Sequence, residues 1–411
     1  MTALKGFRVV DFTQVIFGPA ATQVLAEHGA EVIKIERLRG GDLARDFGPW
    51  HNGQSLPFAG LNLSKRSLSI NLKTEQGLEI IHRLLKNADV LVHNFRSRKV
   101  MEKLGLDYET LKKRYPRLVY AAGSGYGSTG PYVERNKGGH ESMAQALSGA
   151  AARFIGATGP QRLPFTVSDF TGGMLLAQAI LIALLARERS NEGQYVETSL
   201  LDGMMSMQAW TTSSLLNGGD PKEDDGSGGA SHPRGNPLDG AVFKTADGYL
   251  MVTALFRSFG DLMIDLEKAT GVDGLSTDDR FQDLESAKDH RSALNAILEP
   301  VFAKRCNADW IPLLEEYDIL VAPIKTTQEA LQDPQLEINN MLHTVEHAEL
   351  GIMRHVGTPL RLSSTPAEKP EAAPLLGEQN RQILYELGYT ETQVKKIMDA
   401  GIIGGPEKRN S

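Results

Sequence analysis

The chain has 411 residues, with 44 Lys and Arg against 51 Asp and Glu, and its formal net charge is −7. This mildly acidic balance argues against a general nucleic-acid binder, which needs a basic surface. The length suits two domains of roughly 100–200 residues each, and one cysteine, Cys306, excludes an intrachain disulfide and a zinc site made of thiolates.

Neither the N-terminal segment nor the apolar runs predict targeting or membrane insertion. The opening residues, MTALKGFRVVDF, lack the apolar core of a signal peptide. The longest apolar run, residues 174–186, is too short to span a bilayer. We therefore expect a cytoplasmic protein with no membrane partner, and the single cysteine fits a reducing compartment.

The first third of the chain predicts an α/β fold. Short apolar segments typical of strands alternate with segments of helical period, and Thr74 is well placed to cap the second helix. This alternation predicts βαβ units and a parallel sheet. The expected strands are residues 7–13, 31–36, 67–72, 89–95 and 117–124, and the expected helices are residues 18–30 and 74–88.

The remainder of the chain predicts a helix after Asp169, then a strand and a further helix. Residues 217–237 are rich in Gly, Pro and Asp, which predicts a loop at a domain boundary. Residues 240–254 predict a β-hairpin. The Pro-rich segment 358–378 predicts a linker before two final helices.

The segment GYGSTG, residues 125–130, matches the G-x-G-x-x-G pattern and follows an expected strand. A dinucleotide site would need a helix to open at this point and an acidic residue about twenty positions later. Pro131 and Tyr132 follow instead, which favours a structural Gly-rich turn. The chain has no Walker A, H-E-x-x-H or G-x-S-x-G motif, so metal and serine-hydrolase chemistry have no motif support.

Two acidic positions have both a structural and a catalytic interpretation. His140-Glu141 lies at an expected helix start, where Glu is favoured by the helix dipole, but either side chain is also a candidate general acid or base. Asp169 precedes Thr171-Gly172-Gly173 and is a good N-cap. A helix N-terminus would also hold this carboxylate ionised, and the glycines would leave room for a substrate, which suits a nucleophile.

Several basic residues lie near the ends of expected strands. Arg37 follows the strand at 31–36, and Arg96 follows the strand at 89–95. They predict either a solvated surface or a site for an anionic, nucleotide-like ligand at the carboxyl ends of the strands. The others are Lys65, Arg66, Lys73, Arg98 and Lys103.

The whole chain resembles the family III CoA-transferases, the group that contains formyl-CoA transferase and carnitine CoA-transferase. No single segment is specific, but the set of matching segments is. They are LKGFRVVDFTQVIFGPAATQVLAEHGAEVIKIE, LNLSKRSLSINLKTEQG, ADVLVHNFR, LGLDYETLKKRYPRLVYAAGSGYGSTGPY, AQALSG, SDFTGGM and PLLGE.

This resemblance implies a large Rossmann-like domain, built from the N-terminal half and the C-terminal tail, with a smaller α+β domain inserted between them. On this basis the N-terminal part covers residues 1–216, the small domain with its entry linker residues 217–325, and the return linker with the C-terminal part residues 326–411. The resemblance also implies a homodimer whose subunits are threaded through each other as interlocked rings.

The implied chemistry is CoA transfer by covalent catalysis. Asp169 matches the catalytic aspartate, which attacks the acyl-CoA thioester to form a mixed anhydride and then becomes an aspartyl-CoA thioester that the acceptor acid attacks. The Thr171-Gly172-Gly173 turn is one candidate for oxyanion stabilisation. Acyl-CoA and a carboxylic acid are the substrates, and neither a metal nor a permanently bound cofactor is expected.

The implied pocket divides into a substrate part and a CoA part. The substrate part comprises Ile16, His140, Glu141, Gly172 and Gly173, with Glu141 matching a glutamate that contacts the acyl portion. The expected CoA-binding residues are Val15, Arg37, Leu72, Lys73, Asn94, Phe95, Arg96, Lys103 and Lys137.

Two departures from formyl-CoA transferase concern the acyl group. The polyglycine loop of that enzyme corresponds here to GSGGASHPRGNPLDG, with fewer glycines and two prolines. Its polar glutamine near the first strand is replaced by Ile16. Both changes argue against oxalate or formate and favour a larger acyl group, branched or dicarboxylic, of the succinyl type.

Two other functions remain open at this point. One is 2-methylacyl-CoA racemase, which shares the fold and uses a His and an Asp as paired acid and base, here His140 and Asp169. The other is a non-catalytic CoA-binding subunit of a hetero-oligomer, against which the presence of Asp169 argues.

Overall fold

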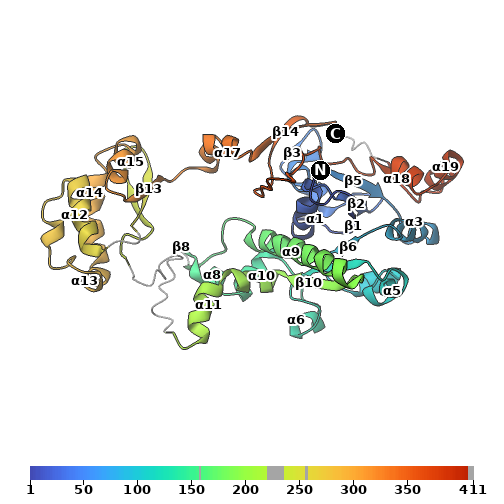
Figure 1. Cartoon of the computed structure of the whole chain (residues 1–411), viewed down its shortest axis with the longest axis horizontal. Coiled ribbons are helices and arrows are strands. Elements are labelled where there is room, and N and C mark those ends of the chain that lie inside the picture. The colour runs from blue at the N-terminus through green and yellow to red at the C-terminus, as the bar shows by residue number, and fades with distance from the viewer. Residues whose placement is uncertain (157–158, 220–235, 255–257, 406–411) are drawn as a thin grey trace. The chain divides into compact units, whose positions relative to one another are not determined.

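Six parallel strands form the central sheet of the larger of two units of the chain (Figure 1). The computed structural model describes residues 1–156, 159–219, 236–254 and 258–405. The larger unit comprises Met1–Gln208 with Gln335–Ser411, and the smaller unit comprises Ala209–Pro334. The predicted α/β class with a parallel sheet is confirmed. The strands are β1 (Arg8–Asp11), β2 (Glu31–Glu36), β5 (Lys65–Ser69), β6 (Val90–His93), β7 (Val119–Ser124) and β10 (Tyr195–Ser199).

The strand order is β10-β7-β6-β1-β2-β5, so the direction in which the sheet grows reverses at β1. The chain proceeds from β1 to β2 and β5, then returns to β6 on the other side of β1. In open parallel sheets, ligands bind beyond the carboxyl ends of the strands at such a switch point. The loops that follow β1 and β6 are therefore the expected place for a site.

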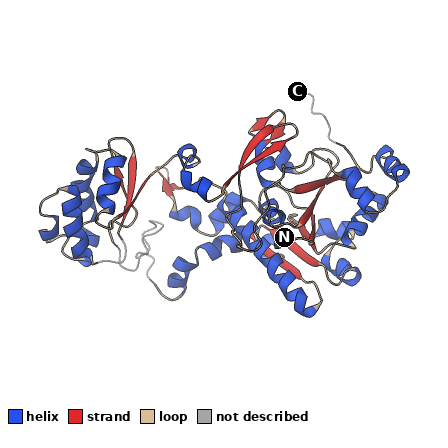
Figure 2. Ribbon diagram, turned by 45° about the horizontal axis from the view of Figure 1, so that its top comes forward, coloured by secondary structure: helices blue, strands red, loops and turns tan. Residues whose placement is uncertain are grey.

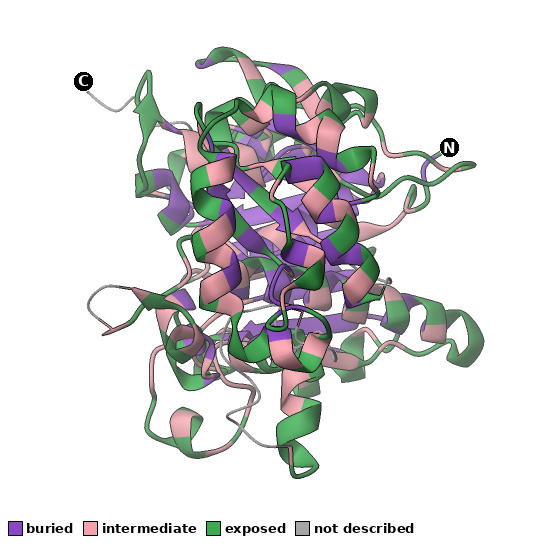
Figure 3. Ribbon diagram, turned by 90° about the vertical axis from the view of Figure 1, so that its left-hand side faces the viewer, coloured by how far each residue is buried: buried purple, intermediate pink, exposed green. Residues whose placement is uncertain are grey.

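Both faces of the sheet are buried, because successive side chains of each strand point to opposite sides. In β1, Val9 belongs to one apolar cluster and Val10 to the other, and both are buried. One cluster packs under α1 (Phe17–Glu27) and α9 (Val167–Ser190), and the other packs under α3 (Glu75–Leu85). Figure 2 shows strands flanked by helices in the larger unit, and Figure 3 shows that buried residues, in purple, include strands behind the helices in front.

The helix α9 is longer than the sequence predicted. It begins at Val167, before Asp169, and extends over 24 residues. By length and composition alone it could cross a membrane, which corrects the expectation drawn from residues 174–186. A helix buried against a sheet meets the same criterion, and α9 packs closely against α1. Its composition therefore assigns no membrane role.

Charged side chains without solvent exposure lie at the carboxyl ends of β1 and β2 and the start of β5. Lys34 Nζ lies 2.8 Å from an Asp42 carboxylate oxygen, and both side chains are completely buried. Lys65 Nζ lies 3.5 Å from Asp11, again with both side chains buried. Lys65 thus lies in the protein interior, and the predictions that it belongs to a solvated surface or to a ligand site are both wrong. Arg66 instead pairs with Glu31 and Glu386.

These buried carboxylates hold the loop between β1 and α1. Asp11 accepts hydrogen bonds from the backbone N–H and hydroxyl of Thr13, at 2.8 and 2.5 Å. Asp42 accepts from the backbone N–H of Val15 at 2.9 Å. Val15 has φ of 70°, a conformation unfavourable for a β-branched residue, so the loop needs this support.

The C-terminal tail completes the larger unit. The two predicted final helices are confirmed as α18 (Asn380–Glu386) and α19 (Glu391–Asp399). Asn380 accepts a hydrogen bond from the backbone N–H of Ser69, at 2.8 Å, and Ile403 pairs with Ile70 beyond β5. The tail thus packs on the edge strand β5 (Figure 1). Two further strands of this unit, β14 (Leu342–His347) and β15 (Gly351–Val356), form an antiparallel pair.

The smaller unit has its own sheet and core. The predicted hairpin is confirmed as β11 (Ala241–Lys244) and β12 (Tyr249–Thr253), which β13 (Leu320–Pro323) extends to three antiparallel strands. Phe302 stacks on Phe243 with ring centroids 4.4 Å apart, and Trp310 donates a hydrogen bond to the Phe302 carbonyl. Its described α-helices include α11 (Ala209–Leu216), α12 (Phe259–Thr270), α13 (Leu284–Asp289), α14 (Arg291–Phe302), α15 (Asn307–Glu315) and α16 (Thr327–Ala330).

We expect Lys34→Met to lower the free energy of unfolding by about 3–5 kcal/mol, because it leaves the Asp42 carboxylate buried without its cation. Urea unfolding followed by circular dichroism measures this. Adding Asp42→Asn should recover part of the loss, since Asn retains an acceptor for Val15. The control is Glu79→Ala, which breaks an exposed ion pair with Arg83 and should cost under about 1 kcal/mol. Equal effects of Lys34→Met and the control would contradict the prediction.

Candidate active site

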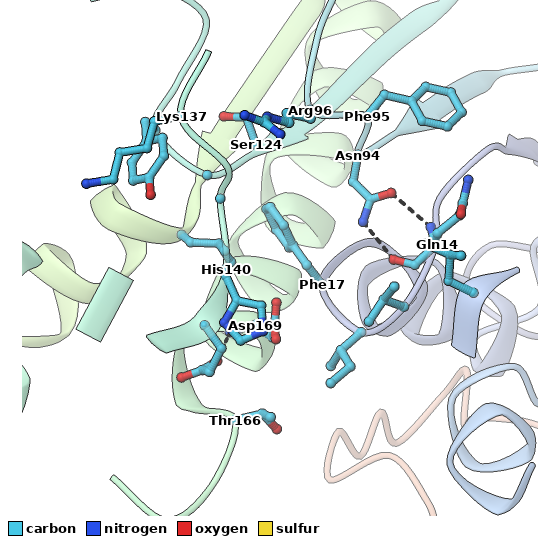
Figure 4. A pocket seen from close by; sticks show the side chains of 18 of the residues that line it. Gln14, Phe17, Asn94, Phe95, Arg96, Ser124, Lys137, His140, Thr166 and Asp169 are labelled. Atoms are coloured by element: carbon cyan, nitrogen blue, oxygen red, sulfur yellow. Dashed lines mark hydrogen bonds between the residues drawn. The ribbon is translucent and has the colours of Figure 1, made fainter. Parts of the chain in front are cut away.

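A cavity of about 520 Å³ opens at the switch point of the sheet. The loops after β1, β6 and β7 supply one part of its wall, and α7 (Glu141–Leu147) and the first turn of α9 supply another. Figure 4 shows side chains from these segments around one space. The lining residues are Gln14, Val15, Ile16, Phe17, Leu43, Phe47, Asn94, Phe95, Arg96, Ser124, Gly125, Tyr126, Gly127, Val133, Asn136, Lys137, Gly139, His140, Glu141, Arg162, Thr166, Asp169 and Leu200.

Asp169 lies in the first turn of α9 and its side chain is half-buried in the cavity wall. The N-cap position of α9 belongs to Thr166, whose side chain makes no capping hydrogen bond. The prediction that Asp169 caps this helix is therefore wrong, because the helix begins two residues before it.

Glu141, from α7, supplies the missing cap. Its carboxylate accepts hydrogen bonds from the backbone N–H groups of Asp169 and Ser168, at 2.9 and 3.1 Å. Gln145 donates a third hydrogen bond to it, at 2.5 Å. Burial alone would raise the pKa of the Glu141 carboxyl, but these hydrogen bonds hold that pKa below its ordinary value. Glu141 is thus an ionised anchor at the positive end of α9.

The carboxyl of Asp169 has the opposite character. Burial, together with the neighbouring Glu141 carboxylate, raises the pKa of Asp169 to about 7. The expectation that the helix N-terminus holds this group strongly ionised is therefore wrong. Glu141 occupies the N–H groups that would have stabilised the charge, and it adds a like charge beside it. A carboxyl that titrates near neutral pH is suited to nucleophilic or acid–base chemistry.

His140 lies beside Asp169 in the same cavity (Figure 4). It is the N-cap of α7, and its Nδ1 accepts a hydrogen bond from the backbone N–H of Ser142 at 3.2 Å. The interpretation of His140-Glu141 as a helix start is confirmed. In the neutral ring Nε2 then carries the proton, so His140 presents a donor to its surroundings.

Gly172 and Gly173 do not line the cavity. They lie inside α9, buried against α1, where an added Cβ would come within 2.8 Å of Phe17. The expected Thr171-Gly172-Gly173 turn is wrong, because these residues are helical. Their N–H groups belong to the helix and their lack of side chains permits the close contact of α1 with α9, so they leave no room for a substrate.

The N-terminus of α1 is an alternative source of backbone donors. Ile16 and Phe17 line the cavity at the start of this helix, and the side chain of Ile16, its N-cap residue, makes no capping hydrogen bond. The first N–H groups of a helix have no partner within the helix and lie at the positive end of its dipole. An oxyanion or an anionic ligand in the cavity could therefore be stabilised there.

Five of the nine expected CoA-binding residues meet at the cavity, namely Val15, Asn94, Phe95, Arg96 and Lys137. Asn94 exchanges two hydrogen bonds of 2.8 Å with the Gln14 backbone, which joins the loops after β1 and β6 (Figure 4). Arg96 donates to the Asn136 carbonyl, and Lys137 lies over the Tyr132 ring. The other four residues, Arg37, Leu72, Lys73 and Lys103, lie outside the cavity lining.

The Gly-rich segment after β7 is a structural turn, as the sequence indicated. The Gly127 N–H donates to the Ser124 hydroxyl at 2.8 Å, and a Cβ on Gly125 would lie 2.4 Å from Gly139 Cα. Only a four-residue helix, α6 (Pro131–Glu134), follows it. The same turn also lines the cavity, a role that the sequence analysis missed although the end of a parallel strand indicates it.

Arg162 and Thr166 are further lining residues that local sequence patterns did not reveal. Of the segment 226–240, compared above with a polyglycine loop, residues up to 235 lie outside the part that the structure describes. Among the described residues no group of three or more His, Cys, Asp or Glu side chains could hold a metal.

Known CoA-transferases match this chain along almost its whole length. The sequence profile of CoA-transferase family III matches residues 4–380. An acyl-CoA transferase of Fusarium pseudograminearum is 34% identical over 98% of this chain and 88% of its own length. A succinate–glutarate CoA-transferase of Agrobacterium fabrum is 32% identical (93% and 95% covered), and an acetyl-CoA:oxalate CoA-transferase of Acetobacter aceti is 33% identical (94% and 96%).

Solved structures give the same result for the fold. A CAIB/BAIF family protein from Brucella suis superposes with a TM-score of 0.81 at 30% identity, over 94% of this chain and 99% of that one. A protein from Mycobacterium tuberculosis superposes with a TM-score of 0.79 at 31% identity, over 93% and 99%.

We expect Asp169→Asn to stabilise the fold more at pH 8 than at pH 5, by about 1–2 kcal/mol. Below the ordinary carboxyl range, Asp169 is protonated in both the folded and the unfolded protein, so its ionisation does not change the free energy of unfolding. Above pH 7, it is ionised in both states, and its raised pKa in the folded protein then lowers the free energy of unfolding by the full amount. Stability of the wild type relative to the variant therefore falls as pH rises through this window. Urea unfolding of both proteins at the two pH values measures the difference. A difference independent of pH would show that Asp169 titrates normally.

Proposed function

The chain belongs to CoA-transferase family III, and on that premise we propose that Asp169 is the group acylated when it moves CoA from an acyl-CoA donor to a carboxylic acid acceptor. One observation carries the proposal: Asp169, with its pKa raised to about 7, lines a cavity at the switch point of the sheet. Its backbone is held there by Glu141.

In the proposed reaction, an ionised Asp169 oxygen attacks the thioester carbonyl, and CoA leaves as a thiolate. This leaves a mixed anhydride of Asp169 and the acyl group. The thiolate then attacks the Asp169 carbonyl carbon, which releases the donor acid and forms an aspartyl-CoA thioester. The acceptor carboxylate repeats these steps in reverse, so Asp169 is restored and the acceptor leaves as its CoA thioester.

Each attack creates an oxyanion that needs hydrogen-bond donors. We assign this role to the N-terminus of α1, at Ile16 and Phe17, because the helical Gly172-Gly173 pair cannot fulfil it. CoA binding is assigned to the residues from the loops after β1, β6 and β7. The positive charges of Arg96 and Lys137 at that edge suit the phosphates of CoA.

A succinyl-type acyl pair is the proposed substrate class. The names of relatives do not decide this, since the Agrobacterium fabrum relative is named for succinate and glutarate and the Acetobacter aceti relative for oxalate, at similar identity. The cavity favours the longer acids, because Val15, Ile16 and Phe17 give it an apolar wall.

We also propose that two copies associate as an interlocked homodimer in the cytoplasm. The support is the outer face of α9, where Met174, Ile182 and Leu185 are exposed by 52–66%. Such a face is unfavourable in water unless another surface covers it.

We expect Asp169→Asn to lower CoA transfer from succinyl-CoA to glutarate by about 10⁴-fold or more, because the nucleophile is removed. Product formation is measured by mass spectrometry. Hydroxylamine added during turnover should convert Asp169 of the wild type, and no other residue, to a hydroxamate.

The matched variant is His140→Asn, which keeps an acceptor at the α7 N-cap and should retain most of the transfer activity. It also tests the racemase alternative, for which His140 in the Asp169 cavity is the favourable observation. Deuterium entering the α-carbon of a 2-methylacyl-CoA without an acceptor acid, and its loss in His140→Asn, would favour the racemase.

We expect kcat/KM for transfer to rise about tenfold per pH unit below pH 7 and to level off above it, because only ionised Asp169 is nucleophilic. Glu141→Gln removes the neighbouring charge but keeps an acceptor for α9, so the midpoint of its profile should move toward the ordinary carboxyl range. Initial rates measured over a range from about pH 4.5 to about pH 9 give both profiles. An unmoved midpoint would show that Glu141 does not control this pKa.

A further inference from the structure

The cavity that contains Asp169 has three cationic side chains among its lining residues, Arg96, Lys137 and Arg162. Arg96 donates to the Asn136 carbonyl, and Lys137 lies 4.9 Å from the centre of the Tyr132 ring. Both belong to the part of the wall assigned to CoA. Arg162 is exposed to the cavity and makes no ion pair or hydrogen bond with any residue in the described ranges.

The backbone next to Arg162 is anchored to the reactive centre. The Leu163 N–H donates to the Gln145 side-chain oxygen at 2.7 Å. The amide nitrogen of the same Gln145 side chain donates to Glu141, which in turn holds the Asp169 backbone. Arg162 therefore belongs to a segment whose position is determined by the same carboxylate that positions Asp169.

Arg162 does not neutralise Asp169. Burial and the Glu141 carboxylate raise the pKa of Asp169, and no cation among the described residues lowers it. Arg162 thus lines the same cavity as Asp169 without forming an ion pair with it. Space between a nucleophile and an unpaired guanidinium is what a substrate with a carboxylate at each end requires.

We propose that Arg162 binds the distal carboxylate of a dicarboxylic acyl group whose other carboxyl carbon reacts with Asp169. This rests on the proposed CoA-transferase function and adds the residue that selects dicarboxylic over monocarboxylic acids. A guanidinium is suited to the task, because its planar donors match both oxygens of a carboxylate. The apolar wall formed by Val15, Ile16 and Phe17 suits the methylene groups between the two carboxyls.

The test compares glutarate with pentanoate, which has the same chain length but lacks the distal carboxylate, as acceptors from succinyl-CoA. The wild type should prefer glutarate. Arg162→Gln should lower kcat/KM for glutarate by roughly 100-fold and leave that for pentanoate within a few-fold, so that the preference collapses. Arg162→Lys, which keeps the charge without the paired donors, should retain an intermediate preference.

The matched control is Arg189→Gln, at the exposed opposite end of α9, which should change neither rate. Thermal unfolding of each variant verifies that it folds. If Arg162→Gln lowers both acceptors equally, or neither, or if the wild type prefers pentanoate, this inference is overturned while CoA transfer stands. If the wild type transfers CoA to no acid at all, the proposed function itself fails.

Discussion

One buried carboxylate determines where the reactive group of this protein lies. Glu141, on the short helix α7, accepts hydrogen bonds from the first-turn N–H groups of α9 and from Gln145. These bonds fix the start of the long core helix and therefore the position of Asp169. Burial of the Asp169 carboxyl, together with the same Glu141 charge, raises the pKa of Asp169 to about 7. The position of Asp169, and part of its raised pKa, thus depend on contact between two residues that are 28 positions apart in the sequence.

Another part of the cavity wall depends on a second set of buried charges. Lys34 and Lys65 each pair with a carboxylate in the interior, and Asp11 and Asp42 hold the loop after β1 through its N–H groups. Buried ion pairs contribute little net stability compared with apolar packing, and we infer that these pairs serve to fix one geometry of the loop. Here that geometry is the strained loop at Val15 and the N-terminus of α1, which line the same cavity as Asp169.

The predictions for Asp169 and Lys65 were wrong for one physical reason, which is that local sequence patterns do not contain partners from elsewhere in the chain. Asp169 before two glycines has the pattern of an N-cap. Because Glu141 caps α9 from outside, the helix extends past Asp169 toward its N-terminus, and the glycines become packing residues against Phe17. Lys65 was similarly grouped with surface cations, although its pairing with Asp11 buries it.

The sequence by itself determined the parallel α/β class, the alternation of the main strands and helices in the first third of the chain and, through resemblance along its length, the family. These follow from hydrophobic periodicity and turn composition, which are local and recur along the chain. Only the tertiary structure decided which residues meet at the cavity. It pairs Asn94 with Gln14, leaves Arg37 and Lys103 outside the lining and places Arg162 in it. Which side chains share a cavity depends on strand order and loop paths, and the ionisation of Asp169 depends on burial and on Glu141, so neither can be read from spacing in the sequence.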